Sequence, residues 1–283
     1  MTDVAVQAGA GSGGVWRLGA VAYLNARPLT AGLAAEPGVQ VRYAVPAALG
    51  GLLESGAVDA AQVPVVDLWR ASGRWEIVSD GCIASQAETL TVRVFSRVSP
   101  DRLTRLHGDP ESHTSVALAR VLWQELYGTR LEIVTDAGPG ECEAELRIGD
   151  KVVAAAPRGF GFEVDLGGAW RHLTGLPFVF AVWAARAGRD WSALAALLER
   201  ARDAGVSQAA ALAERHAREH GWPVELARRY LCETLCYQLT PAMRDGLARF
   251  FELGQRHGVL GRDAADAESG HAGGRSRLDR ARH

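Results

Sequence analysis

Three hydroxyl side chains stand before an apolar helical run in the stretch GDPESHTSVALARVLWQEL. They are Ser112, Thr114 and Ser115, and apolar residues then recur at helical spacing up to Leu126. One hydroxyl is enough to cap the first turn of a helix, so a simple cap is the favoured interpretation of this stretch alone. Hydroxyls, free backbone amides and the positive helix end can also hold a carboxylate or phosphate together.

Two further polar residues follow predicted strands. Asn25, in YLNARPL, comes directly after a strand and before a helix, where strand carboxyl ends meet the cleft of open α/β sheets. It either caps that helix or holds a hydroxyl or carboxylate without adding a charge. Ser85, in IASQAET, stands just before a predicted crossover, a position that faces a cleft, although no G-x-S-x-G elbow surrounds it.

The sequence predicts neither a metal site nor a redox pair. The four cysteines lack C-x-x-C spacing; they are Cys82, Cys142, Cys232 and Cys236. The last two lie one helical turn apart, which predicts two small apolar residues on a buried helix face. His216 and His220 also lie one turn apart, but Ala217 stands where a zincin has glutamate. We therefore interpret the histidines as a solvated helix face, with a metal site as the alternative, and expect no cofactor.

Alternating element types at the start of the chain predict a mostly parallel sheet covered by helices. The expected elements are a strand over 16–24, a helix over 25–37, a strand over 39–45, a helix from 46 to about 56, and a strand with its loop over 59–69.

The middle of the chain repeats this alternation of strands and helices, which predicts a second lobe. Its expected elements are β-rich 82–97, a short strand and the helix from 112, strands near 131–136 and 144–148 with a turn at Gly149-Asp150, and a returning strand within 175–188. From Asp190 onward the pattern is helical throughout, including PVELARRYLCETLCYQL.

This pattern predicts two α/β lobes joined by two extended crossovers, with a hinge and a ligand cleft between them. The expected division is a flexible leader over 1–15, lobe 1 over 16–93 and 180–260 with C-terminal helices, lobe 2 over 94–179, and a disordered tail over 261–283.

Composition excludes several classes of protein. With 283 residues, 48% of them hydrophobic and 23% charged, the chain is long enough for a full core. The net charge of −2 predicts neither a nucleic-acid nor a membrane partner. No apolar run approaches the ~20 residues of a membrane span, and the first residues lack the pattern of a secretory signal. We expect a reduced, cytoplasmic protein and leave a homodimer open.

Several segments together resemble the chorismate dehydratases of menaquinone biosynthesis. These segments are GAVAYLNARPL, VDAAQVPVVDLW, CIASQAETLTV, GDPESHTSVALARVL, LRIGDKV and DLGGAWRHLTGLPFVFAVWA, in order from about Leu18 to Gly188. The resemblance implies the fold of type II periplasmic binding proteins. It also implies a hydro-lyase that removes water from chorismate to give 3-[(1-carboxyvinyl)oxy]benzoate, the first step of the futalosine route, without metal or organic cofactor.

The resemblance also implies roles for particular residues. Asn25 and Ser85 correspond to the family positions nearest the reacting centre, and Ser112, Thr114 and Ser115 would hold a substrate carboxylate. Neither Asn25 nor Ser85 has a histidine or carboxylate beside it in its motif, so our hypothesis is that a substrate carboxylate accepts the proton.

This chain departs from the family pattern at two positions. Ala87 replaces an expected glycine, which would narrow the cleft, and His113 replaces a common arginine. His113 when protonated, or Arg27 in the first motif, could supply the missing cation; Arg27 could equally be an ordinary surface residue. We therefore include both among the candidate substrate-binding residues.

Two alternatives remain. The sibling enzyme that makes 1,4-dihydroxy-6-naphthoate has an aspartate after the asparagine of its first motif, where this chain has Ala26. A non-catalytic protein that binds small anions is the second alternative, although an exported one should carry a signal.

Overall fold

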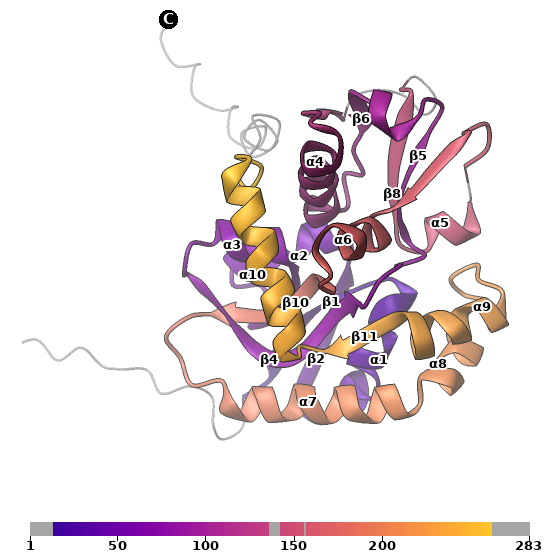
Figure 1. The fold of residues 1–283 in the computed structure, drawn as a ribbon. Helices are drawn as coiled ribbons and strands as arrows, with labels where there is room; N and C mark the ends of the chain where they lie inside the picture. Colours follow the sequence, from indigo (N-terminus) through magenta and orange to yellow (C-terminus); the bar gives the residue numbers. More distant parts are fainter. Residues whose placement is uncertain (1–13, 136–141, 156, 262–283) are drawn as a thin grey trace, which may run out of the picture.

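The strands of the protein form two sheets, seen in the lower and upper halves of Figure 1. The computed structural model describes residues 14–135, 142–155 and 157–261. The predicted leader over 1–15 and tail over 261–283 lie almost entirely outside these residues. Within them, no helix combines the length and apolar character needed to cross a bilayer.

The first sheet has the strand order β11-β4-β10-β3-β1-β2. Its strands are β1 (Trp16–Val21), β2 (Val39–Ala44), β3 (Ala60–Pro64), β4 (Trp75–Ser85), β10 (Phe178–Arg186) and β11 (Leu235–Gln238). The first of these pairs in parallel with β2 and β3, as the alternation of elements predicts. Strand β10 returns between β3 and β4 and pairs antiparallel with both.

The second sheet has the order β7-β6-β8-β5-β9. Its strands are β5 (Val92–Ser96), β6 (Arg105–His107), β7 (Glu132–Val134), β8 (Ala144–Ile148) and β9 (Phe162–Asp165). Both β5 and β10 lie wholly in one sheet, whereas the predicted boundaries at 93/94 and 179/180 pass through them. We keep the division into two lobes as a proposal, with these two strands undivided.

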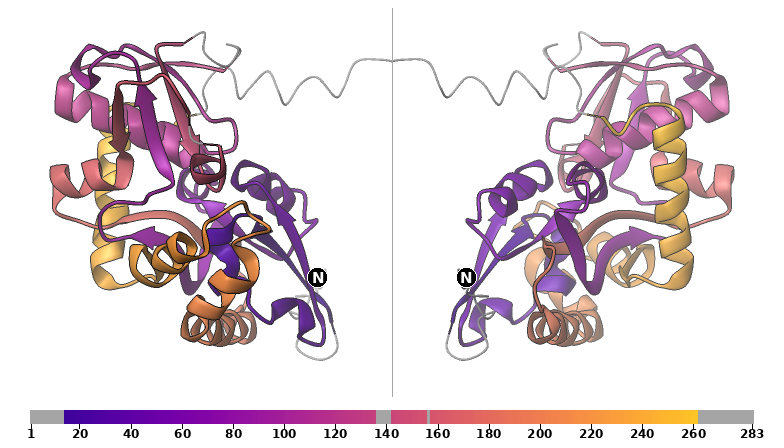
Figure 2. Two further views of the ribbon diagram at one scale, coloured as in Figure 1. Left: turned by 90° about the vertical axis from the view of Figure 1, so that its right-hand side faces the viewer. Right: turned by 90° about the vertical axis from the view of Figure 1, so that its left-hand side faces the viewer.

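Helices cover both sheets (Figure 2). They are α1 (Arg27–Thr30), α2 (Pro46–Glu54), α3 (Val65–Arg70), α4 (His113–Tyr127), α5 (Lys151–Ala154), α6 (Leu166–Thr174), α7 (Ser192–Ser207), α8 (Ala209–His216), α9 (Val224–Arg229) and α10 (Pro241–Arg256). Leu194 and Leu198 of α7 pack with Leu18 and Trp183 on one face of the first sheet. A larger apolar cluster extends from the first lobe into the second.

Two predicted boundaries are wrong. The first strand ends at Val21, and Leu24–Ala26 form a 3-10 turn. Residues 65–69 form helix α3 rather than a loop, because a short apolar run does not distinguish a buried helix from a strand and Pro64 ends the strand. The stretch before the returning strand, for which we predicted no element, forms α6, whose amino end is capped by the Asp165 carboxylate.

The segment LCYQ, Leu235–Gln238, differs most clearly from our prediction. We predicted helix throughout 223–239, but a π-helix over Tyr230–Thr234 leads into β11, which pairs with β4. Leu235 and Tyr237 are buried and Gln238 is exposed, a period of two that suits a strand beside an open sheet edge. The predicted buried cysteine pair is therefore also wrong: Cys232 is exposed, and Cys236 lies on the strand, partly buried.

Candidate functional site

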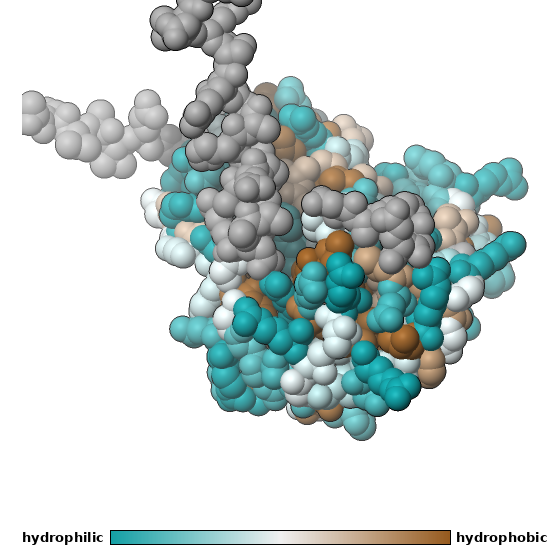
Figure 3. Space-filling view, turned by 90° about the horizontal axis from the view of Figure 1, so that it is seen from above, coloured by the Kyte–Doolittle hydropathy of each residue, from teal (hydrophilic) through white to brown (hydrophobic). Residues whose placement is uncertain are grey.

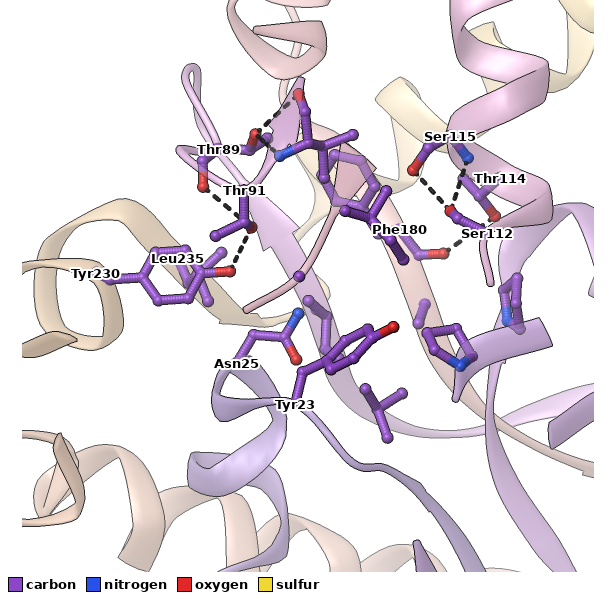
Figure 4. A pocket seen from close by; sticks show the side chains of 18 residues that line it. Tyr23, Asn25, Thr89, Thr91, Ser112, Thr114, Ser115, Phe180, Tyr230 and Leu235 are labelled. Carbon is purple, nitrogen blue, oxygen red and sulfur yellow. Dashed lines mark hydrogen bonds between the residues drawn. The ribbon is translucent and has the colours of Figure 1, made fainter. Parts of the chain in front are cut away.

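A cavity lies between the two sheets (Figure 4). Eighteen residues line it. They come from the carboxyl ends of β1, β3, β4 and β8, the 3-10 turn after β1, the first turns of α2 and α4, the crossover into β5 with the first residue of that strand, strand β10, and the π-helix with β11. Strand ends and helix starts thus converge on one cavity, as in other open α/β folds.

Helix α4 brings its hydroxyl groups to one end of the cavity. Ser112 caps the helix, because its Oγ accepts from the Ser115 amide at 3.2 Å and donates to Ser115 Oγ at 2.8 Å. Thr114 Oγ1 accepts from the Val66 amide at 3.4 Å and donates to the Phe180 carbonyl at 3.3 Å. The capping interpretation is therefore confirmed, and the same helix start lines the cavity.

Asn25 lies at the other end, beside Thr91 and Tyr230 (Figure 4). Its Oδ1 is buried and has no hydrogen-bond partner in the part of the chain that the structure describes. The Thr91 hydroxyl and Tyr230 Oη lie 2.7 Å apart. Burial raises the pKa of Tyr230 above its ordinary value, and hydrogen bonds from Thr91 and Asn25 oppose this only in part. Tyr230 is therefore a neutral phenol that can donate a hydrogen bond.

None of the lining residues carries a formal charge. An anion in the cavity would therefore be held by hydroxyls, amides and helix starts rather than by an ion pair. The described residues also contain no group of three or more His, Cys, Asp or Glu side chains placed to hold a metal ion.

The structure brings four of the seven predicted site residues together. Asn25, Ser112, Thr114 and Ser115 all line the cavity. Ser85 does not, since it is fully buried and its hydroxyl donates to the Ala87 carbonyl at 3.0 Å. Its catalytic role stays a prediction.

The two predicted cations lie outside the cavity lining. His113 Nδ1 is 2.8 Å from the Asp67 carboxylate. Arg27 lies over the Tyr43 ring, and its Nη2 is 3.1 Å from His220 Nε2. His220 in turn contacts Asp150 and is mostly buried, so the predicted solvated histidine face is wrong at this position.

Sequence reasoning missed several lining residues, among them Tyr23, Thr89, Thr91, Phe180 and Tyr230. Tyr23 and Thr91 stand in the segments YLN and ETLTV, which we singled out for their neighbours. Tyr230 lies in a segment predicted as ordinary helix, and it is the first residue of the π-helix that leads into β11. No local pattern marks it.

A sequence model of the menaquinone biosynthesis family matches residues 16–256. The chain belongs to this family. A chorismate dehydratase of Thermus thermophilus is 33% identical over 260 residues, which cover 83% of this chain and 93% of that protein.

Solved structures share the fold of this member of the menaquinone biosynthesis family. Protein AF1704 of Archaeoglobus fulgidus superposes with a TM-score of 0.68 at 14% identity, covering 86% of this chain and 97% of that one. The alkanesulfonate-binding protein SsuA of Xanthomonas axonopodis gives 0.61 at 14% identity, covering 89% and 96%. The aliphatic sulphonate-binding SsuA of Escherichia coli gives 0.58 at 14%, covering 91% and 97%. The predicted periplasmic-binding-protein-like fold is confirmed.

Proposed function

We propose that this protein is a chorismate dehydratase, a hydro-lyase that converts chorismate to 3-[(1-carboxyvinyl)oxy]benzoate and water. The Thermus thermophilus relative, 33% identical over most of both chains, carries the proposal. The cavity agrees with it, because hydroxyls and the α4 start at one end and an uncharged amide at the other suit a ligand with two carboxylates.

The reaction removes the proton on ring C3 and the hydroxyl on C4: the electron pair of the C3–H bond forms a ring double bond as the C4–O bond breaks, the ring becomes aromatic, and the net loss is one water. In our proposal Ser112, Thr114 and Ser115 hold one carboxylate at the start of α4. Asn25 and the neutral Tyr230 phenol donate hydrogen bonds near the departing hydroxyl. The protein thus contributes orientation and hydrogen bonds.

The lining offers no histidine or carboxylate side chain as a base. We therefore assign proton removal to a carboxylate of the substrate itself, held in place by the same contacts. A protein base would have to reach the cavity from outside its described lining.

The test is to mix the purified protein with chorismate and follow products by chromatography and mass spectrometry. We expect an aromatic product lighter by one water that keeps the enolpyruvyl ether, with turnover strongly reduced in Asn25→Ala. If the wild-type protein binds chorismate without converting it, the proposal fails in favour of a small-anion-binding protein. If chorismate is neither bound nor converted, the next activity to test is that of the sibling enzyme that makes 1,4-dihydroxy-6-naphthoate.

A further inference from the structure

The turn Gly149–Asp150–Lys151 joins strand β8 to helix α5 and faces the segment Tyr23–Asn25 of the first lobe. Gly149 itself lines the cavity. Since Asn25 projects into the cavity from that same segment, contacts made by this turn bear directly on where the Asn25 amide lies.

Asp150 receives hydrogen bonds from two separate parts of the first lobe. The Leu24 amide lies 3.3 and 3.2 Å from its two carboxylate oxygens. His220 Nδ1 lies 2.6 Å from Oδ2, and Trp222 Nε1 donates to Oδ1 at 2.9 Å. Arg27 can only donate to His220 Nε2, so Nδ1 carries the hydrogen that His220 gives to Asp150.

The residues on either side of Asp150 hold Tyr23. Gly149 has φ +67°, and a Cβ there would lie 2.8 Å from the Tyr23 ring, so only glycine allows this approach. Lys151 Nζ lies 2.7 Å from a Glu111 carboxylate oxygen, and the Tyr23 hydroxyl donates to the same carboxylate. The ring and the hydroxyl of Tyr23 are thus both fixed by the second lobe.

Through Trp222, Asp150 also acts on Tyr230, the second side chain of the proposed reacting centre. Trp222 stacks on Tyr230 with ring centroids 4.7 Å apart and an interplanar angle of 21°. Asp150 therefore holds Asn25 through the Leu24 amide and holds Tyr230 through Trp222. These are the two side chains that donate hydrogen bonds in the proposed reaction.

We propose that Gly149–Asp150–Lys151 is the closure turn of this enzyme, and that Asp150 is a positioning residue that brings Asn25 and Tyr230 together only when the lobes are closed. The catalytic part of this proposal rests on the proposed function. The closure itself rests on the contacts alone.

The first test compares Asp150→Ala, Asp150→Asn and the control Asp59→Asn, in which the altered carboxylate pairs with Arg17 away from the cavity. We expect Asp150→Ala to lower kcat about a hundredfold, as for a misplacement of about 1 Å, with a smaller rise in KM. Asp150→Asn keeps one acceptor oxygen and should recover part of kcat. The control should keep wild-type kcat. An Asp150→Ala enzyme with wild-type kcat would overturn the positioning role.

A double-mutant cycle separates positioning from general damage to the structure. If Asp150 acts through Asn25, then Asp150→Ala should lower kcat much less in an Asn25→Ala background than in the wild type. If the fold-losses in kcat of the two single variants simply multiply in the double variant, the proposal is contradicted.

Small-angle X-ray scattering tests closure independently of activity. We expect a larger radius of gyration for Asp150→Ala than for the wild type or Asp59→Asn, each measured without ligand. An unchanged radius would overturn the closure role. If the wild type fails to convert chorismate, the proposed function falls, and the scattering still decides the role of the turn.

Discussion

Asn25 presents an uncharged amide to a cavity whose lining carries no formal charge. Asn25→Asp keeps the side-chain shape but places a negative charge beside a dianionic substrate with no lining cation to offset it. We expect KM for chorismate to rise by about tenfold or more, because like charges at short range repel by a few kcal/mol even at protein surfaces. Gln40→Glu, exposed on β2, adds the same charge elsewhere and should leave KM unchanged. Equal KM values for Asn25→Asp and wild type would argue against binding of the dianionic substrate beside Asn25.

Two buried tyrosines offer a matched comparison. Tyr230 Oη contacts the Thr91 hydroxyl, whereas Tyr237 Oη is buried without a hydrogen-bond partner among the described residues. Tyr230→Phe should lower kcat and cost about 1 kcal/mol of stability, the usual value of a lost hydrogen bond. Tyr237→Phe should leave kcat unchanged and the protein equally or more stable. Steady-state kinetics and thermal unfolding measure both effects, and equal kcat losses would remove the reason for assigning Tyr230 a role.

At the scale of elements, the short helix α1 that follows Asn25 rests closely on α7. A Cβ on Gly205 of α7 would lie 1.9 Å from the Pro28 carbonyl oxygen, so Gly205→Ala must separate the helices. We expect a loss of about 2 kcal/mol or more, with lower activity because α1 supports Asn25. Gly51 of α2 has open space around it, and Gly51→Ala should gain about 1 kcal/mol. Melting temperatures that move in the same direction in both variants would contradict this packing.

Periodicity predicts the elements whose partners are near in sequence. The parallel pairing of β1 with β2 and β3 follows from alternating strands and helices, and helix α4 follows from its cap and apolar spacing. Strand β11 could not be predicted in this way. Its strand character depends on the open edge of β4, about 150 residues earlier in the chain.

In the candidate site too, the sequence predicts the residues that depend on nearby segments and misses those that depend on distant ones. Asn25 and the hydroxyls of α4 could be predicted because each stands at a strand end or a helix start. Tyr230 enters the cavity from a distant π-helix. Arg27 and His113 look like anion-binding cations in their motifs, but neighbours from other segments, His220 and Asp67, engage them instead. Such competition between partners depends on the folded arrangement.

At the scale of the whole molecule, two lobes meet around a cavity whose lining is uncharged. Hydrophilic residues cover much of the face shown in Figure 3. Some of the polar contacts between the lobes lie beside the cavity, where Ala47 donates its amide to the Glu111 carbonyl and the Glu111 carboxylate accepts from the Tyr23 hydroxyl. These partly buried polar groups add to the apolar cluster that extends from one lobe into the other.

The charge of Glu111 makes these polar contacts depend on pH. Burial alone would raise the Glu111 pKa, but hydrogen bonds from Lys151 and Tyr23 outweigh it and lower the pKa below its ordinary 4.5. Asp109, which also contacts Lys151, is the other charged group of this cluster. A lowered pKa in the folded protein adds stability above pH 4.5 that disappears as pH falls through the folded value.

Glu111→Gln removes that contribution at every pH. We expect the melting temperature of the wild type to exceed that of Glu111→Gln near pH 7, and the gap to narrow as pH falls below 4.5, because protonated Glu111 then resembles glutamine. Glu132→Gln breaks an exposed pair with Arg105 and should change the melting temperature little. A gap that stays constant down to about pH 3 would mean that the Glu111 charge does not stabilise the fold.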